Sequence, residues 1–121
     1  MRRITLSALL LSLALAGCGE NGRFASELGE SYGPANVYYE TADSTRLRVS
    51  FLDSPFAERP DSARAGTARK VAEYVRDHFP RYKALDKVTV EFMTAKETRA
   101  GAKNAAARYP FSHATLGEPR S

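Results

Sequence analysis

The chain is poor in the residues that build most catalytic, metal-binding and disulfide-bonded sites. Its 121 residues include no Trp, one Cys and two His. A single Cys cannot form a disulfide within its own chain, and the two His do not stand at the spacing of metal ligands. The chain also has no phosphate-binding glycine loop and no G-x-S-x-G turn. The sequence therefore predicts no cofactor, no metal ion and no motif of a known catalytic class.

The chain has little excess of either charge. It contains 18 Lys and Arg against 14 Asp and Glu, and two of the basic residues, Arg2 and Arg3, stand in front of an apolar segment. Between residues 61 and 83 the basic residues alternate with acidic ones. A nucleic-acid-binding surface needs basic side chains gathered on one face. The charge pattern favours an ordinary solvated surface and predicts no nucleic-acid partner.

The first 18 residues have the three parts of a bacterial export signal. Arg2 and Arg3 give a positive start, residues 4–14 are apolar, and Leu15-Ala16-Gly17-Cys18 follows them. The apolar run is too short for a transmembrane helix, which needs about 20 residues. This order resembles the signal peptide and lipobox of bacterial lipoproteins.

The resemblance implies that residues 1–17 are removed by cleavage between Gly17 and Cys18. In such lipoproteins the cysteine sulfur carries a diacylglyceryl group, and the new amino terminus receives a fatty acid such as palmitate. Two or more acyl chains give a stable membrane anchor. Gly19 takes the place of the aspartate that marks inner-membrane retention in enteric bacteria. We therefore expect an outer-membrane anchor with the rest of the chain facing the periplasm.

Residues 18–34 have the composition of a flexible, lipidated tether. They are rich in Gly and poor in large apolar side chains, and such chains are flexible. A flexible chain of this length has an r.m.s. reach of about 20–24 Å. A short helix over residues 24–28 is the alternative for the middle of this segment. We expect the tether to hold a small α+β domain, residues 35–116, away from the membrane. Residues 117–121 are expected to form a loose C-terminal tail.

Three segments predict the strands of this domain. Residues 36–41 and 45–52 are rich in β-branched and aromatic residues and flank a turn, which indicates a hairpin. Residues 87–94 alternate apolar and polar side chains. Residues 107–113 form a candidate fourth strand, which Pro110 would confine to an edge of the sheet.

One helix is predicted between the second and third strands. From Asp61, the candidate N-cap, to about His78 the apolar residues recur at spacings of three and four, and Pro80 ends the pattern. A strand–helix–strand order favours parallel pairing of the two strands. Residues 95–106 are expected to form a loop or a weak helix. The expected fold is a small mixed sheet in ββαβ order, with a candidate fourth strand and one helix packed on one face.

The predicted sheet leaves its other face open to solvent or to a partner. Arg46, Arg48, Ser50, Thr89 and Glu91 fall on that face by alternation. Tyr38 and Tyr39 are adjacent in a strand, so one points to the core and the other to the open face. An exposed aromatic beside Arg is typical of surfaces that contact a protein, peptide or glycan. The candidate partner surface consists of Tyr38, Tyr39, Arg46, Arg48 and Glu91.

Two functional hypotheses follow from these observations. The first is a lipid-anchored, non-catalytic interaction or accessory domain of the cell envelope, with a protein or cell-wall partner. The alternative is a small envelope enzyme or ligand-binding protein that acts on cell-wall material through His78 or His113 and nearby carboxylates. The enzyme hypothesis requires His113 to lie within hydrogen-bond reach of His78, Glu73 or Asp77 inside a pocket. The interaction hypothesis expects the two His to be separate and exposed.

Overall fold

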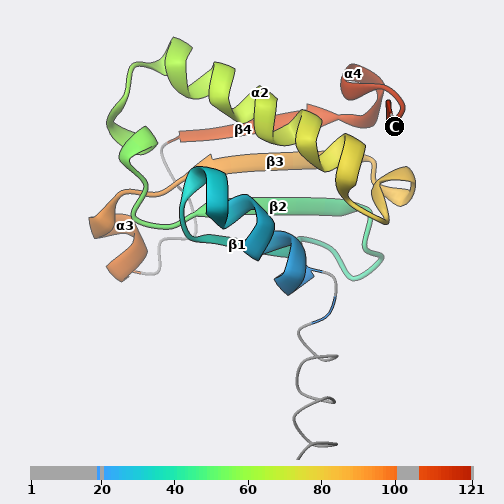
Figure 1. The fold of residues 1–121 in the computed structure, drawn as a ribbon, viewed down its shortest axis with the longest axis horizontal. Helices are drawn as coiled ribbons and strands as arrows, with labels where there is room; N and C mark the ends of the chain where they lie inside the picture. The colour runs from blue at the N-terminus through green and yellow to red at the C-terminus, as the bar shows by residue number, and fades with distance from the viewer. Residues whose placement is uncertain (1–18, 20, 101–106, 121) are drawn as a thin grey trace, which may run out of the picture.

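The computed structural model describes residues 19, 21–100 and 107–120, which form a four-stranded sheet with helices on one face (Figure 1). In spatial order the strands are β1 (Ala35–Tyr39), β2 (Arg46–Phe51), β3 (Lys87–Phe92) and β4 (Ala107–Ser112). The β2–β3 pair is parallel and the two outer pairs are antiparallel. This confirms the predicted α+β class, the mixed sheet and the fourth strand at an edge. Cys18 and the segment before it lie outside the described residues.

The register of the sheet separates apolar from polar side chains. Because side chains alternate between faces, the apolar rows on the helix-covered face alternate along the strands with the rows of the other face, which hold most of the polar side chains. Most members of these apolar rows are buried, and the others pack against the buried core. The apolar rows are Tyr39–Leu47–Val88–Phe111, Val37–Val49–Val90–Tyr109 and Ala35–Phe51–Phe92–Ala107.

Helix α2 (Asp61–His78) packs against β3 and β4 (Figure 1). Its buried stripe includes Ala68, Val71, Ala72 and Val75, as the spacing predicts. The predicted N-cap is wrong, because Pro60 holds the cap position without a side-chain bond. The Asp61 carboxylate instead accepts a hydrogen bond from the Tyr109 hydroxyl at 2.7 Å.

Residues 21–32 form a second helix on the same face of the sheet, which corrects the predicted flexible tether (Figure 1). Phe24 and Leu28 are 3% and 1% exposed, and the Phe24 ring lies 5.2 Å from that of Phe79. These two residues and Tyr32 are spaced four apart, so they share one face of the helix. Burial of that face outweighs the cost of about 1 kcal/mol that each interior Gly imposes on a helix.

The predicted loose tail is also wrong for the part that the structure describes. After the short helix α4 (His113–Leu116), the Gly117 carbonyl accepts a hydrogen bond from the Tyr82 hydroxyl at 2.7 Å. The Arg120 backbone N–H donates to the Asp77 carboxylate at 3.0 Å. The tail is held because side chains distant in sequence satisfy its backbone groups.

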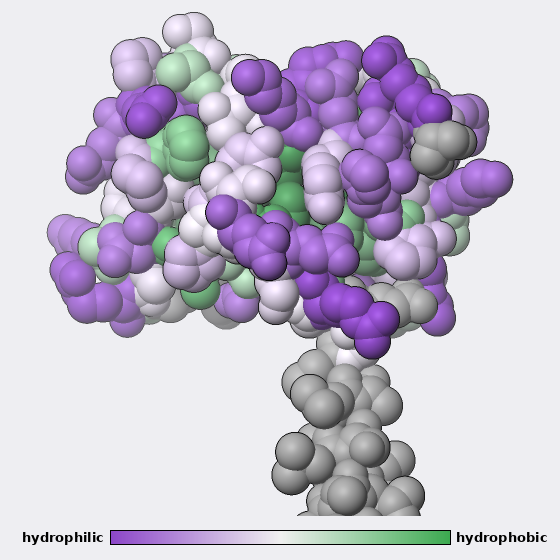
Figure 2. Space-filling view, viewed as in Figure 1, coloured by the Kyte–Doolittle hydropathy of each residue, from purple (hydrophilic) through white to green (hydrophobic). Residues whose placement is uncertain are grey.

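Three short segments complete the described fold. They are η1 (Pro55–Glu58), η2 (Tyr82–Ala84) and α3 (Ala95–Ala100). Residues 95–100 therefore adopt the helical alternative of the two expected, and residues 101–106 lie outside the described residues. On the helical side, hydrophilic side chains cover most of the surface and apolar ones show in small separate areas (Figure 2). The buried core cluster runs from Phe24 to Leu116, so the chain from residue 19 onward contains all of its members.

Candidate interaction surface

The sheet face opposite the helices carries a network of polar side chains centred on Glu91. The Glu91 side chain is 4% exposed. One of its carboxylate oxygens accepts a hydrogen bond from the Ser50 hydroxyl, and the other accepts one from Arg108 Nε at 3.0 Å. Ser50 and Arg108 are the direct register partners of Glu91 on β2 and β4. The network is therefore set by strand pairing, which brings such side chains within reach of each other.

Arg48 extends this network toward β1. Its Nη1 atom lies 3.8 Å from Glu91, and its Nε donates to Glu40 at 3.0 Å. Burial lowers the pKa of Arg48, but the hydrogen bond to Glu40 and the charges of Glu40 and Glu91 outweigh it and raise the pKa. The guanidinium is therefore held in one place between two carboxylates.

The open face is less exposed than the sequence predicts. Ser50, Thr89 and Glu91 are buried, whereas the sequence predicts a face that is open to solvent or to a partner. The longer side chains of Arg48 and Arg108 lie beside these residues in the register. In the middle of a four-stranded sheet, longer side chains on the neighbouring strands shield a short or paired side chain from solvent. The alternation within one strand does not reveal this shielding.

The two adjacent tyrosines point to opposite faces, as predicted. Tyr38 is 41% exposed and is the large hydrophobic residue that stands exposed in the described part of the chain. It lies opposite Arg48 in the register. Tyr39 is half-buried on the core side, with its ring 6.4 Å from that of Phe79. The structure thus removes Tyr39 from the candidate partner surface and keeps Tyr38, Arg48 and Glu91 on one face. The exposed Arg46 lies on the same face, one row nearer the end of the sheet.

His113 is occupied by contacts within the C-terminal region. Its Nδ1 lies 2.9 Å from the Leu85 carbonyl oxygen and its Nε2 lies 3.0 Å from Glu118. Its ring stacks on Tyr82 at 4.7 Å. The hydrogen bond to Glu118, followed by that to Leu85, raises the pKa of His113.

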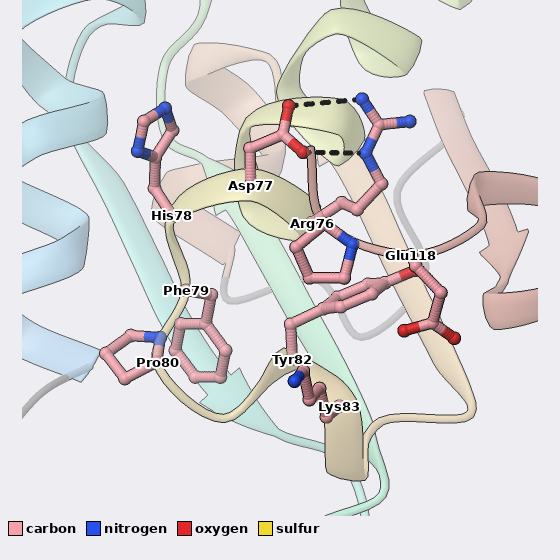
Figure 3. A pocket seen from close by; sticks show the side chains of 9 residues that line it. Arg76, Asp77, His78, Phe79, Pro80, Tyr82, Lys83 and Glu118 are labelled. Atoms are coloured by element: carbon pink, nitrogen blue, oxygen red, sulfur yellow. Dashed lines mark hydrogen bonds and ion pairs between the residues drawn. The ribbon is translucent and has the colours of Figure 1, made fainter. Parts of the chain in front are cut away.

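His78 lies apart from His113. His78 is exposed, and its ring contacts that of Tyr74 in a tilted arrangement with 4.3 Å between centroids. It lines an open cleft of about 380 Å³ beside Asp77, Tyr82 and Glu118 at the end of α2 (Figure 3). The described residues give no hydrogen bond between the two His, nor between either His and Asp77 or Glu73. The arrangement that the enzyme hypothesis requires is therefore not found there.

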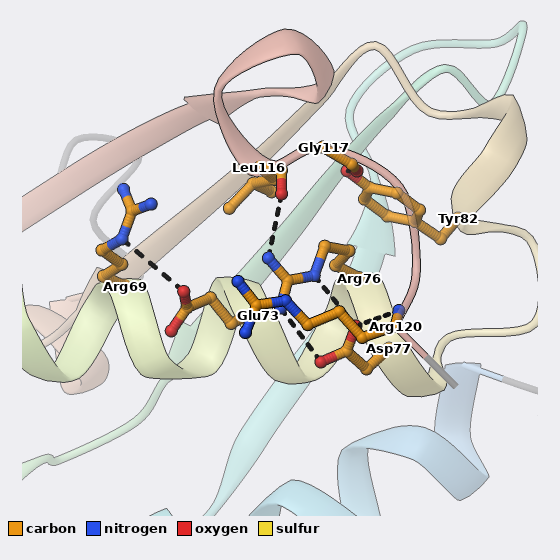
Figure 4. Close-up of polar contacts among 8 residues, drawn as sticks. All are labelled: Arg69, Glu73, Arg76, Asp77, Tyr82, Leu116, Gly117 and Arg120. Atoms are coloured by element: carbon orange, nitrogen blue, oxygen red, sulfur yellow. Dashed lines mark hydrogen bonds and ion pairs between the residues drawn. The ribbon is translucent and has the colours of Figure 1, made fainter.

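The carboxylates near this cleft hold other parts of the structure together. Asp77 accepts two hydrogen bonds from Arg76, at 2.9 and 3.1 Å, and this contact holds the pKa of Asp77 at about 2 (Figure 4). Arg76 is buried and also donates to the Leu116 carbonyl at 2.9 Å. Glu73 pairs with Arg69 at 3.7 Å. The Arg76–Leu116 contact and the Arg120–Asp77 hydrogen bond fasten the C-terminal tail to α2, whereas the Arg69–Glu73 pair lies within the helix.

No protein-family model, curated protein or solved structure matches this chain. Within the described ranges, no helix is both long and apolar enough to cross a bilayer. The same ranges contain no group of three or more His, Cys, Asp and Glu placed to hold a metal ion.

Two members of the polar network, Arg108 and Glu40, are absent from the surface predicted by sequence. Arg108 falls in the predicted fourth strand, where alternation would have placed it on the face of Pro110. Its pairing with Glu91 depends on the β3–β4 register, which a single strand pattern does not contain. Glu40 follows β1 and reaches Arg48 across the hairpin.

Proposed function

We propose that this chain is a lipid-anchored cell-envelope protein whose folded domain is a non-catalytic interaction or accessory module. The observation that carries the proposal is the order of a positive start, an apolar run and Leu15-Ala16-Gly17-Cys18. Cys18 would carry the lipid and become the first residue after cleavage. Gly19 favours the outer membrane, with the domain facing the periplasm.

Under this proposal the anchor would lie close to the domain, because the helix that follows it is packed on the core. Gly19 and Glu20 stand between Cys18 and residue 21, and the helix is fastened to the core by Phe24 and Leu28. The three residue steps from Cys18 to residue 21 span at most about 10 Å, the length of a fully extended chain. Under this proposal the domain lies near the membrane surface and does not stand off on a long stalk.

The proposed contact surface is the open sheet face around Tyr38, Arg46 and Arg48. Arg48 is fixed between Glu40 and Glu91, so a partner would meet a preorganised guanidinium beside an exposed aromatic ring. Tyr and Arg are the residue types most enriched at the centres of protein interfaces. We infer a protein or cell-wall partner and no nucleic-acid partner.

The anchor is tested by labelling the full chain in a Gram-negative host with an alkyne analogue of palmitate. The native chain and the leader control Ser7→Ala should incorporate the label and partition into the detergent phase. Cys18→Ala should lose the label and remain unprocessed or be released, because the sulfur that starts the modification is gone. If Cys18→Ala still incorporates the label as the native chain does, the proposal is wrong.

A further inference from the structure

The two edges of the sheet are built differently, and β4 is the protected one. The His113 N–H donates to the Asp86 carbonyl at 2.8 Å, one step beyond the β3–β4 pairs. In an antiparallel ladder, alternate residues turn their backbone groups outward. Because His113 bonds to Asp86, just before β3, residues 108, 110 and 112 turn their backbone groups away from β3. Pro110 is the middle one of these three. Proline has no N–H, so this edge lacks its middle donor, as is typical of edges protected against pairing.

Among the residues that the structure describes, the β1 edge has no such protection. The Glu40 N–H donates to Arg46 at 2.8 Å, and the Leu52 N–H donates to Pro34 at 2.9 Å. By the same alternation, Ala35, Val37 and Tyr39 turn their N–H and C=O groups outward. The strand contains neither proline nor a charged side chain. An uncharged edge with all of its outward donors is suited to pairing with another strand.

A groove runs along this open edge. Residues 35–38 of β1 form one side of it, and Asn21, Gly22 and Ala25 of the N-terminal helix form the other, enclosing about 360 Å³. The helix lies beside β1 at this edge (Figure 1). The small side chains of Gly22 and Ala25 leave room for a second backbone and for a helix that accompanies it.

We propose that β1 pairs with β1 of a second copy of this chain, antiparallel and centred on Val37. The two-fold axis sets Val37 opposite its own counterpart, where the two residues exchange both backbone hydrogen bonds. It also sets small Ala35 opposite large Tyr39, and Asn36 opposite the exposed Tyr38. Because the strand has no charge, the symmetry opposes no like charges, which would otherwise destabilise the pair. This self-complementarity favours a second copy over a strand of another protein.

The proposed dimer is compatible with a membrane anchor but does not depend on one. Asn21 lines the same groove as Val37, so the N-terminal segments of both copies would emerge near the two-fold axis. The experiments use the chain from residue 19 onward, which contains the whole described core and has no Cys. Their failure would therefore leave the lipid-anchor proposal untouched.

Disulfide cross-linking tests the register of the pair. Opposed Val37 residues in a hydrogen-bonded pair would have Cα atoms about 5.5 Å apart, within the range that a disulfide spans. The two Tyr38 residues would be offset by two positions and lie roughly 8 Å apart, outside that range. We expect Val37→Cys to form a disulfide dimer under mild oxidation, and Tyr38→Cys, although more exposed, to form little. Equal cross-linking of the two variants would overturn the proposed register.

Sedimentation equilibrium tests the role of the outward amide. Val37→Pro removes an N–H that does not bond to β2, so the β1–β2 ladder is kept and the chain should become monomeric. Val37→Ala keeps the N–H and should remain dimeric, and a thermal melt of each variant shows whether it folds. If Val37→Pro does not fold, the cross-linking comparison decides. The dimer is overturned if the native chain stays monomeric as its concentration is raised and the Val37→Cys variant forms no disulfide.

Discussion

Replacing Leu28 by Ala tests whether the helix over residues 21–32 belongs to the fold. Leu28 is 1% exposed and is part of the core cluster. The substitution removes buried methyl groups and leaves a cavity, and fully buried Leu→Ala changes cost about 2–5 kcal/mol. Ala is the better helix former of the two. Any loss of stability therefore reports the lost packing of Leu28 in the core cluster.

The expected loss is large enough to measure by thermal unfolding. In a domain of this size, 1 kcal/mol shifts the melting temperature by about 4–8 °C. Leu28→Ala should therefore melt at least about 8 °C below the native chain when followed by circular dichroism. Glu30→Ala is the matched control, since Glu30 is exposed on the same helix, and it should change stability by about 0.5 kcal/mol or less. If the two variants melt together with the native chain, this segment is a tether and the packing argument is refuted.

Two further predictions concern the polar contacts. Glu91→Gln removes the charge that Arg108 contacts at 3.0 Å, and it should lower the free energy of unfolding by about 1–3 kcal/mol in urea titrations. The control Glu40→Gln, nearer the edge of the sheet, should lower it by less than about 1 kcal/mol. Equal effects of the two substitutions would show that the burial of Glu91 is not decisive. The pKa of Asp77 is lowered from 3.8 to about 2 by Arg76, so its contribution to stability is complete above about pH 4 and is lost as the pH falls through about 2. Asp77→Asn should flatten the fall of the unfolding free energy across that range, and an unchanged slope would contradict the assignment.

Much of the sheet could be predicted from local patterns. Leu47, Val49 and Phe51 alternate with polar residues, and Val88 and Val90 do the same, because a strand with one buried face repeats every two residues. The course of α2 follows from its spacing of apolar residues and from Pro80. Tyr38 and Tyr39 were separated correctly between faces, but only the structure shows that Tyr38 is the exposed one.

The full N-terminal helix over residues 21–32 could not be predicted from the sequence, because the local pattern supports at most a short helix over residues 24–28. Gly22 and Gly29 disfavour a helix, and short helices are marginal without tertiary support. Phe24 and Leu28 stabilise it only when a sheet is present to receive them. The polar network around Glu91 depends in the same way on register, because Arg108 is distant from it along the chain.

The sequence alone determined the alternation of the strands, the extent of α2, the edge position implied by Pro110 and the lipobox-like order that ends at Cys18. These features are local, and each is written in the spacing of neighbouring residues. The tertiary structure decided that residues 21–32 pack on the sheet, that the C-terminal tail is held by Arg76 and Tyr82, and which backbone amides of β1 turn away from β2. Those outcomes depend on groups that the fold brings together from distant parts of the sequence. The packing and hydrogen bonds between these groups contribute to stability only once the strands have paired.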